Sequence, residues 1–297
     1  MSAHESARTS SKAVRSQSRA NRSTREHWTY FASHRAEIHK LLVTGLRPSA
    51  EPAGRLCVLG AGNCNDIDVP ALLETFAEVH LVDIDAGAVG AAVERQGVAS
   101  SPRVRLHGGV DLTGMAARFA DWDKAPPTDG DVLSAAREIV WPGVPDVGGP
   151  FDAVLSPCLL SQLVGYASDV LGGSHQRRRE LLVALRRRHL RQVTELLTPS
   201  GTGLIVCDVA SSDGHSELHA APRSALPAIL DRLTYTDRGF DGLSPASMRD
   251  AVTSDPLIAP LLATPQLISP WLWTLGPRRR FLVYAMRLRR CGVPLLG

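Results

Sequence analysis

The sequence predicts an α/β fold built on a parallel sheet, and two observations near its first third carry that prediction. Leu56 to Leu59 form a continuous apolar run, the pattern of a strand buried on both faces, and Val79 to Val82 read as a second apolar strand. A glycine turn and a short helical segment lie between them, which gives the order strand, turn, helix, strand. The 297 residues are 44% hydrophobic and 21% charged, a composition that suits one large domain with a full core.

The turn after the first strand is suited to a ligand. Gly60 and Gly62 let the backbone turn sharply and approach a bound group with no Cβ in the way. Asp68 is expected to cap a short helix that starts at Pro70. The second strand ends at Asp83, about 20 residues past the first glycine, where a carboxylate can accept both hydroxyls of a ribose. The pattern indicates a nucleoside-binding site.

The glycine spacing separates two classes of cofactor. A dinucleotide site uses G-x-G-x-x-G, and Asn65 stands where the third glycine would be. The turn GAGNCND instead offers Asn63, Asn65 and Asp66, which suits a ligand without phosphate groups. A dinucleotide site is therefore disfavoured.

At these residues the chain resembles the class I S-adenosylmethionine-dependent methyltransferases, whose first motif is a strand followed by G-x-G-x-G and whose second ends in a ribose-binding acid. Two positions depart from that pattern: Cys64 replaces the third glycine, and Val58 stands where the family usually has an acid. The resemblance implies S-adenosylmethionine as the cofactor. It implies cofactor contacts from Gly60, Ala61, Gly62, Asn63, Asp83 and Ile84.

Later segments follow the order of that family. Val104 to Leu106 read as a third strand, Phe151 to Leu155 as a fourth and Leu204 to Cys207 as a fifth that ends at Asp208. The resemblance adds Asp111 and Leu112 as adenine contacts. The motif SPCLLSQL, which follows the fourth strand, adds Ser156 and Pro157 on the cofactor side and Gln162 in the substrate pocket.

The end of the chain reads as a hairpin. Trp271 to Leu275 and Phe281 to Leu288 are apolar segments joined by turn residues. A terminal hairpin that inserts one antiparallel strand is a hallmark of the family. The resemblance thus implies a Rossmann-like, seven-stranded, mostly parallel sheet with one antiparallel strand, plus helical insertions, and a core at residues 51–209 and 271–297.

The segment before the first strand divides into two parts. Residues 1–22 are rich in Ser, Arg and Ala without apolar periodicity, so we expect a disordered tail, with a transit peptide as the minor alternative. Ser23 and Glu26 form a capping-box pattern that opens a cap helix within residues 23–50. Such helices often cover the active site in the family. The substrate pocket is then expected to include Trp28, Tyr30, Phe31 and His34, although ordinary core packing also explains this stripe.

Two long insertions are expected to form a roof beyond the carboxyl ends of the strands. The first spans Ala116 to Pro150. The second, residues 210–270, is predicted to be a helical lid, with a peripheral role or a homodimer contact as the alternative. It supplies His215 and His219 as candidate general bases, although surface-loop histidines are the plainer interpretation.

Composition and residue spacing argue against several kinds of partner and site. No run of about 20 apolar residues exists, so no membrane span is predicted. The five cysteines form no C-x-x-C pair and read as reduced thiols of a cytoplasmic protein. The formal charge of +3 is small, and the arginines from Arg177 to Arg191 lack interleaved aromatic residues and read as the solvated side of a helix spanning His175 to Leu197. Nucleic acid is therefore disfavoured as a partner, and no metal site is expected because His34 and His39 lack ligand spacing.

The resemblance implies methyl transfer to a small-molecule acceptor, in keeping with specialised metabolism. An RNA or protein methyltransferase and an aminopropyl transferase stay open as alternatives. A Rossmann-like binding domain without catalysis is the non-enzyme reading, and Val58 and Cys64 are its support. The residues from Ser156 differ from the Asp/Asn-Pro-Pro-aromatic motif of enzymes that methylate adenine or glutamine nitrogens.

Overall fold

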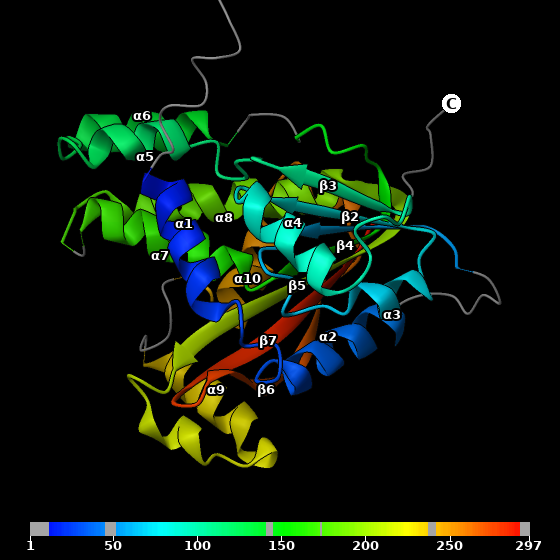
Figure 1. Ribbon diagram of the computed structural model, residues 1–297. Coiled ribbons are helices and arrows are strands. Elements are labelled where there is room, and N and C mark those ends of the chain that lie inside the picture. The colour runs from blue at the N-terminus through cyan, green and yellow to red at the C-terminus, as the bar shows by residue number, and fades with distance from the viewer. Residues whose placement is uncertain (1–11, 45–51, 141–144, 173, 237–241, 292–297) are drawn as a thin grey trace, which may run out of the picture.

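The computed structural model describes residues 12–44, 52–140, 145–172, 174–236 and 242–291. One seven-stranded sheet has the order β3-β2-β1-β4-β5-β7-β6. The first five strands pair in parallel, and β7 is antiparallel to β5 and β6, as Figure 1 shows. The predicted α/β class, strand number and terminal hairpin are confirmed. The strands are β1 (Arg55–Leu59), β2 (Glu78–Asp83), β3 (Val104–Gly108), β4 (Phe151–Pro157), β5 (Leu197–Ser211), β6 (Gln266–Gly276) and β7 (Arg279–Arg289).

Helices cover both faces of the sheet (Figure 1). The core on one face is shared with α2 (Ala32–Thr44), α3 (Val69–Leu73) and α4 (Ala86–Arg95). The core on the other face is shared with α5 (Ala116–Trp122), α6 (Asp129–Glu138), α7 (Leu159–Leu171), α8 (Arg178–Glu195), α9 (Leu226–Tyr235) and α10 (Pro245–Thr253). Short 3₁₀ helices span Ser216–His219, Arg223–Ala225 and Ala259–Leu261. No helix in the described ranges is long and apolar enough to cross a bilayer.

The apolar runs and caps act as the sequence predicts. Leu56 and Val58 pack on one side of β1 and Cys57 and Leu59 on the other, and all four are fully buried. The Asp68 side chain accepts a hydrogen bond from the backbone of Ala71, 3.0 Å away, at the start of α3. Local sequence therefore determines the first βαβ unit.

The N-terminal segment differs from the prediction. Lys12–Thr24 form helix α1, whereas residues 1–22 were expected to be disordered; residues 1–11 lie outside the described part of the chain. Ser23 lies in the last turn of α1, where its hydroxyl donates to the carbonyl of Ala20, so it does not open a capping box with Glu26. The next helix, α2, starts at Ala32. Polar tertiary contacts hold α1, and periodicity does not reveal such contacts.

Helix α8 is also less exposed than expected. Arg188 and Arg191 are buried, so the arginines are not simply its solvated side. The Arg188 guanidinium donates to the carbonyls of Leu112 and Ile139. Arg191 forms a two-point ion pair with the fully buried Asp255, with N–O distances of 2.9 and 3.0 Å. Arg188 and Arg191 thus tie both insertions to α8.

The insertion at residues 210–270 packs against the molecule on several sides. Its α9 lies beside β6, and α10 lies beside α8. The buried hydroxyl of Tyr284 in β7 donates to the carbonyl of Leu243. The buried apolar side chains of the insertion, such as Leu230 and Met248, therefore belong to the core.

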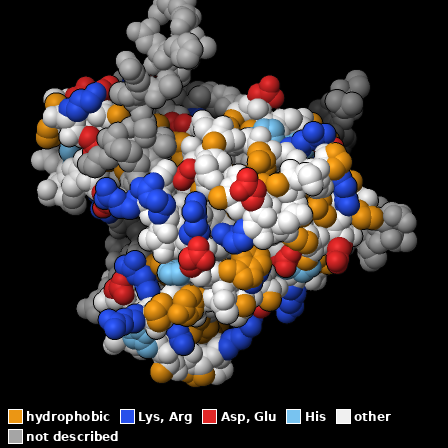
Figure 2. Space-filling model, in the orientation of Figure 1, with side chains coloured by type: hydrophobic (Ala, Val, Ile, Leu, Met, Phe, Trp, Pro, Cys, Tyr) orange, Lys and Arg blue, Asp and Glu red, His pale blue; other side chains and the backbone are white. Residues whose placement is uncertain are grey.

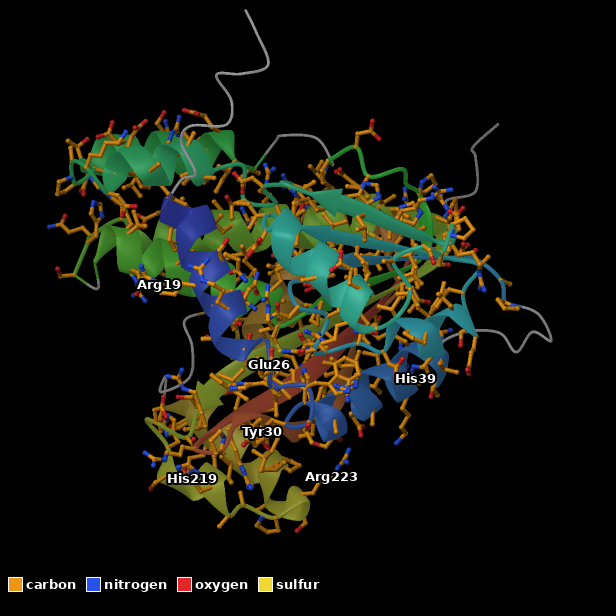
Figure 3. All side chains as sticks on the ribbon, viewed as in Figure 1. Arg19, Glu26, Tyr30, His39, His219 and Arg223 are labelled. Atoms are coloured by element: carbon orange, nitrogen blue, oxygen red, sulfur yellow. The ribbon has the colours of Figure 1, made fainter. Side chains whose placement is uncertain are left out.

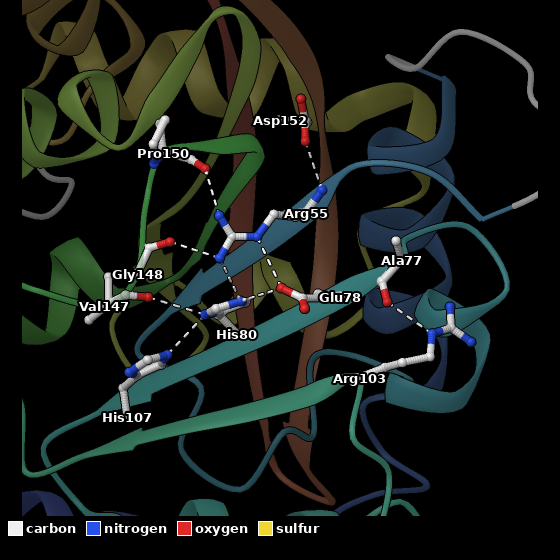
Figure 4. Close-up of polar contacts among 10 residues, drawn as sticks. All are labelled: Arg55, Ala77, Glu78, His80, Arg103, His107, Val147, Gly148, Pro150 and Asp152. Carbon is white, nitrogen blue, oxygen red and sulfur yellow. Dashed lines mark hydrogen bonds and ion pairs between the residues drawn. The ribbon is translucent and has the colours of Figure 1, made fainter.

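A polar cluster at the amino ends of β1 and β2 fixes the end of the first insertion (Figure 4). The Arg55 guanidinium donates to Glu78 and to the carbonyls of Gly148 and Pro150. His80 stacks on His107, with 2.9 Å between Nδ1 and Nε2. Burial lowers the pKa of both histidines, which favours their neutral forms. No group of side chains suited to a metal ion occurs among the described residues.

Candidate cofactor and acceptor site

A cavity of about 480 Å³ lies at the carboxyl ends of the parallel strands. Its walls come from the turns after β1, β2, β3 and β4, from α1 and α7, and from the β6–β7 hairpin. Open parallel sheets bind ligands at this edge. Eight of the ten residues predicted to contact the cofactor line it, namely Gly60, Ala61, Gly62, Asn63, Asp83, Ile84, Asp111 and Leu112.

Gly60 and Gly62 both occupy backbone positions that require glycine. Gly60 has a φ of +77° and Gly62 a φ of +47°, in the left-handed region that side chains disfavour. A Cβ on Gly60 would lie 2.8 Å from the Leu159 side chain, and one on Gly62 would lie 3.1 Å from the Asn21 side chain. Cys64, the departure from the family pattern, also has a left-handed φ of 50° and is buried. The turn therefore keeps its shape without the third glycine.

Asp83 lies at the end of β2 and faces the cavity while only 4% of its surface is exposed. Its two carboxylate oxygens accept hydrogen bonds from the backbone N–H groups of Gly62 and Asp85, each at 2.8 Å. Burial raises the pKa of Asp83, while these donors act in the opposite direction. Each oxygen retains a second lone pair for a ligand hydroxyl. Asp85 instead caps α4 through the backbone of Ala88.

Helix α1 covers the glycine turn, and in Figure 1 it crosses in front of the strand ends between α4 and α7. The Asn63 amide donates to the carbonyl of Asn21 and to the hydroxyl of Thr24. The Asn65 amide donates to the carbonyl of Thr24. The Asn21 amide reaches Asp85 at 3.1 Å. The asparagines that the sequence offered to a ligand thus hold the covering helix.

The remaining predicted cofactor residues differ in position. Asp111 lines the cavity, and its carboxylate also accepts hydrogen bonds from Thr113 and from the backbone of Ala116. Ser156 and Pro157 do not line it. The Ser156 hydroxyl lies 2.8 Å from His189 Nε2, and both residues are buried beneath the sheet. Side chains alternate along a strand, and Ser156 falls on the α8 side.

Sequence comparison provides no relative. No protein-family model matches the chain, and no curated protein matches it. Among solved structures, it is similar to magnesium protoporphyrin IX methyltransferase from Synechocystis with bound S-adenosylhomocysteine, at 11% identity over 88% of this chain and 84% of that one, with a TM-score of 0.42. It is also similar to 1,6-didemethyltoxoflavin-N1-methyltransferase from Burkholderia thailandensis, at 15% identity over 98% and 91% of the two chains, with a TM-score of 0.43. These low values carry no argument about activity.

The strand order of the sheet, with β7 as its antiparallel member, decides the fold family. The fold is that of the class I S-adenosylmethionine-dependent methyltransferases. In this fold the glycine turn, Asp83 and the β6–β7 hairpin all contribute to the lining of one cavity.

The residues predicted for the substrate pocket separate into two groups. Phe31 and Gln162 line the cavity. Trp28 instead stacks under the guanidinium of Arg35, 3.5 Å from the ring centre, and Tyr30 is 41% exposed on the surface (Figure 3). His34 is fully buried behind the cavity wall.

The candidate bases in the second insertion do not reach the cavity. Neither His215 nor His219 lines it, and none of the described residues 210–236 and 242–270 does. Figure 3 shows His219 at the bottom of the view, near α9 and far from α1. The covering position that was expected for this insertion is taken by α1.

Several residues at the hairpin end were not singled out by sequence reasoning. Asp208, Trp273 and Phe281 line the cavity there, together with Asp66, which the sequence had already offered to a ligand. Asp208 stands at the carboxyl end of the fifth predicted strand, which was a usable signal. The two aromatic residues belong to the terminal hairpin, and only the sheet order shows that it reaches the site.

Proposed function

We propose that this protein is an S-adenosylmethionine-dependent methyltransferase that acts on a small molecule. The observation that carries the proposal is the buried Asp83, held by two backbone N–H groups beside a turn that only glycine fits. A nucleoside with an amino-acid tail needs these two features together: an acceptor for ribose hydroxyls and an open backbone turn.

The residues of the cavity fit that cofactor. Gly60 and Gly62 would hold its amino-acid portion, Asp83 its ribose, and Asp111 and Leu112 its base. When bound, the cofactor supplies a methyl group on a sulfonium. The chain's own contribution is to bind and orient the cofactor and the acceptor and to exclude water. Helix α1 would exclude water because it covers the glycine turn.

The charges of the cavity support a small-molecule acceptor over RNA. Its lining includes the carboxyl side chains of Asp66, Asp83, Asp111, Asp169 and Asp208, and one basic side chain, Arg279. Phosphate groups would be repelled by such a lining. Basic and acidic side chains are also interspersed over the face shown in Figure 2. Nucleic-acid binding proteins instead gather basic residues into one patch.

The role of Asp83 is tested by comparing Asp83→Asn with Asp85→Asn. The first variant keeps one carbonyl acceptor but loses the negative charge and one oxygen toward the ribose. Loss of one charge-assisted hydrogen bond costs about 1.5 to 3 kcal/mol, so affinity for S-adenosylmethionine should fall roughly tenfold to a few hundredfold. Asp85→Asn keeps a helix cap and should bind within a few-fold of the parent. Titration calorimetry measures the affinity of both variants. Equal losses of affinity would contradict the assignment of Asp83 as the ribose-binding acid.

A further inference from the structure

The hairpin end of the cavity forms a chamber, which we call the acceptor chamber. It is lined by residues of separate elements: Phe31, Asp66, Cys158, Asp208, Trp273 and Phe281. Phe31 and Trp273 meet edge to face with ring centres 5.2 Å apart, and Trp273 and Phe281 are tilted neighbours at 5.1 Å. An aromatic wall of this kind binds flat apolar groups and also favours a cation over its ring faces.

Asp208 is the most deeply buried acid of the chamber. Its exposed fraction is 6%, and its carboxylate accepts a hydrogen bond from the hydroxyl of Ser161 in α7. In the described parts of the chain no basic side chain forms an ion pair with it. Burial raises the pKa of Asp208 to about 6. The group is therefore a carboxylate at neutral pH, but one that accepts a proton readily.

Asp66 adds a second negative charge. His34 Nε2 lies 3.2 Å from an Asp66 oxygen. His34 Nδ1 accepts a hydrogen bond from the indole N–H of Trp271 at 3.0 Å, and an indole can only donate. His34 therefore contacts Trp271 with one ring nitrogen and Asp66 with the other, which fixes the position of the Asp66 carboxylate.

Arg279, the basic side chain of the lining, forms an ion pair with Asp213, and its guanidinium carbon lies 5.6 Å from the centre of the Phe281 ring. The chamber thus combines two carboxylates with an aromatic wall. Among the described residues, no lysine or arginine forms an ion pair with either carboxylate. A neutral or acidic acceptor would leave Asp208 buried without a counter-charge, which is unfavourable.

We propose that the acceptor is an aromatic or apolar amine whose nitrogen binds between Asp66 and Asp208, and that Asp208 receives its proton. The inference rests on the proposed function and names the substrate class. The bound ammonium first gives one proton to the Asp208 carboxylate, which frees the nitrogen lone pair. The lone pair then forms a bond to the methyl carbon while the carbon–sulfur bond breaks, with its electron pair going to sulfur. The product leaves as a methylated ammonium, and Asp208 releases its proton to solvent.

The binding test uses matched probes on the full-length protein saturated with S-adenosylhomocysteine. Phenethylamine and tryptamine are compared by calorimetry with 2-phenylethanol, tryptophol, 3-phenylpropanoate and indole-3-propionate. The amines should bind at least about tenfold more tightly than the matched alcohols, and the acids should bind more weakly still. Asp208→Asn should remove the preference for amines while affinity for the alcohols changes little. The cavity-lining Asp169, which is exposed, provides the control Asp169→Asn, which should keep the preference.

The outcomes separate the two proposals. If S-adenosylhomocysteine itself does not bind, the proposed function fails and this inference fails with it. If it binds, but the amines bind no better than the alcohols or do not bind at millimolar concentration, the substrate class is wrong and the methyltransferase proposal stands.

A second readout needs no acceptor. Because the folded state raises the pKa of Asp208 above its unfolded value, the folded state binds the proton more tightly, and stability falls as pH rises from about 4 to 6. The neighbouring thiols of Cys158 and Cys207 stay neutral in this range, since burial raises the pKa of both. Asp66 lines the same space and His34 lies behind its wall, and both are unchanged in the variant. Asp208→Asn should therefore melt above the parent at pH 8, by about 5 °C, and near the parent at pH 4. A lower melting temperature at pH 8 would show that Asp208 is a structural acid and overturn its role.

Discussion

Gly62→Val should abolish binding of S-adenosylmethionine while leaving a folded protein. The residue has a φ of +47°, and a new side chain would meet Asn21 at 3.1 Å and point toward Asp83 at 3.9 Å. The valine would fill the space beside the ribose acid and force the turn to change shape. We expect an affinity loss of about a hundredfold or more, roughly 3 kcal/mol, by calorimetry.

The matched control is Gly97→Val. Gly97 also has a left-handed φ, +71°, but a Cβ there meets nothing within 4 Å, and the residue does not line the cavity. Both variants should lose some stability from backbone strain, and only Gly62→Val should lose the cofactor. Normal binding by Gly62→Val would show that the ligand does not cross this turn, and the proposed site would be wrong.

Asp255→Ala should be the most destabilising of these single substitutions. It removes the fully buried partner of Arg191 and leaves the guanidinium in the core, where the Val140 carbonyl, 2.9 Å away, is among its other contacts. Removing one member of a buried ion pair costs about 3 to 5 kcal/mol. Urea unfolding followed by circular dichroism measures this loss. Asp255→Asn serves as a milder variant if the alanine protein does not fold.

Two further variants isolate the buried charge as the cause. Asp121→Ala removes an acid from an ion pair with Lys124 in which both side chains are 74% exposed, and it should barely move the unfolding midpoint. The double variant Arg191→Leu/Asp255→Leu should recover part of the loss, because neither charge then remains in the core. If Asp255→Ala is as stable as the parent, the ion pair does not hold the insertion to α8.

The first βαβ unit is predictable from sequence because its determinants are local. Each strand is rich in adjacent apolar residues, and Asp68 and Asp85 cap the helices that follow the two strands. The terminal hairpin is predictable from sequence for the same reason. The sheet order then places Gly60, Gly62 and Asp83 together, since parallel strands end at one edge.

The features that sequence reasoning missed depend on contacts between distant residues. Helix α1 has few apolar residues and is held by Asn63 and Asn65, about 40 positions away in the chain. The α8 arginines are buried because Asp255 and loop carbonyls reach them. The Ser156 side chain points away from the cavity because Ser156 still belongs to β4, which continues to Pro157. Side chains alternate between the two faces of a strand, and this position faces α8.

The central claim is that the cavity binds S-adenosylmethionine. Calorimetric titration of the full-length protein with S-adenosylmethionine, with S-adenosylhomocysteine and with NAD tests it most directly. The account predicts saturable, one-to-one binding of both sulfur nucleosides and no binding of NAD, because Asn65 stands where a pyrophosphate site needs glycine. Binding of NAD with no response to either sulfur nucleoside would contradict it.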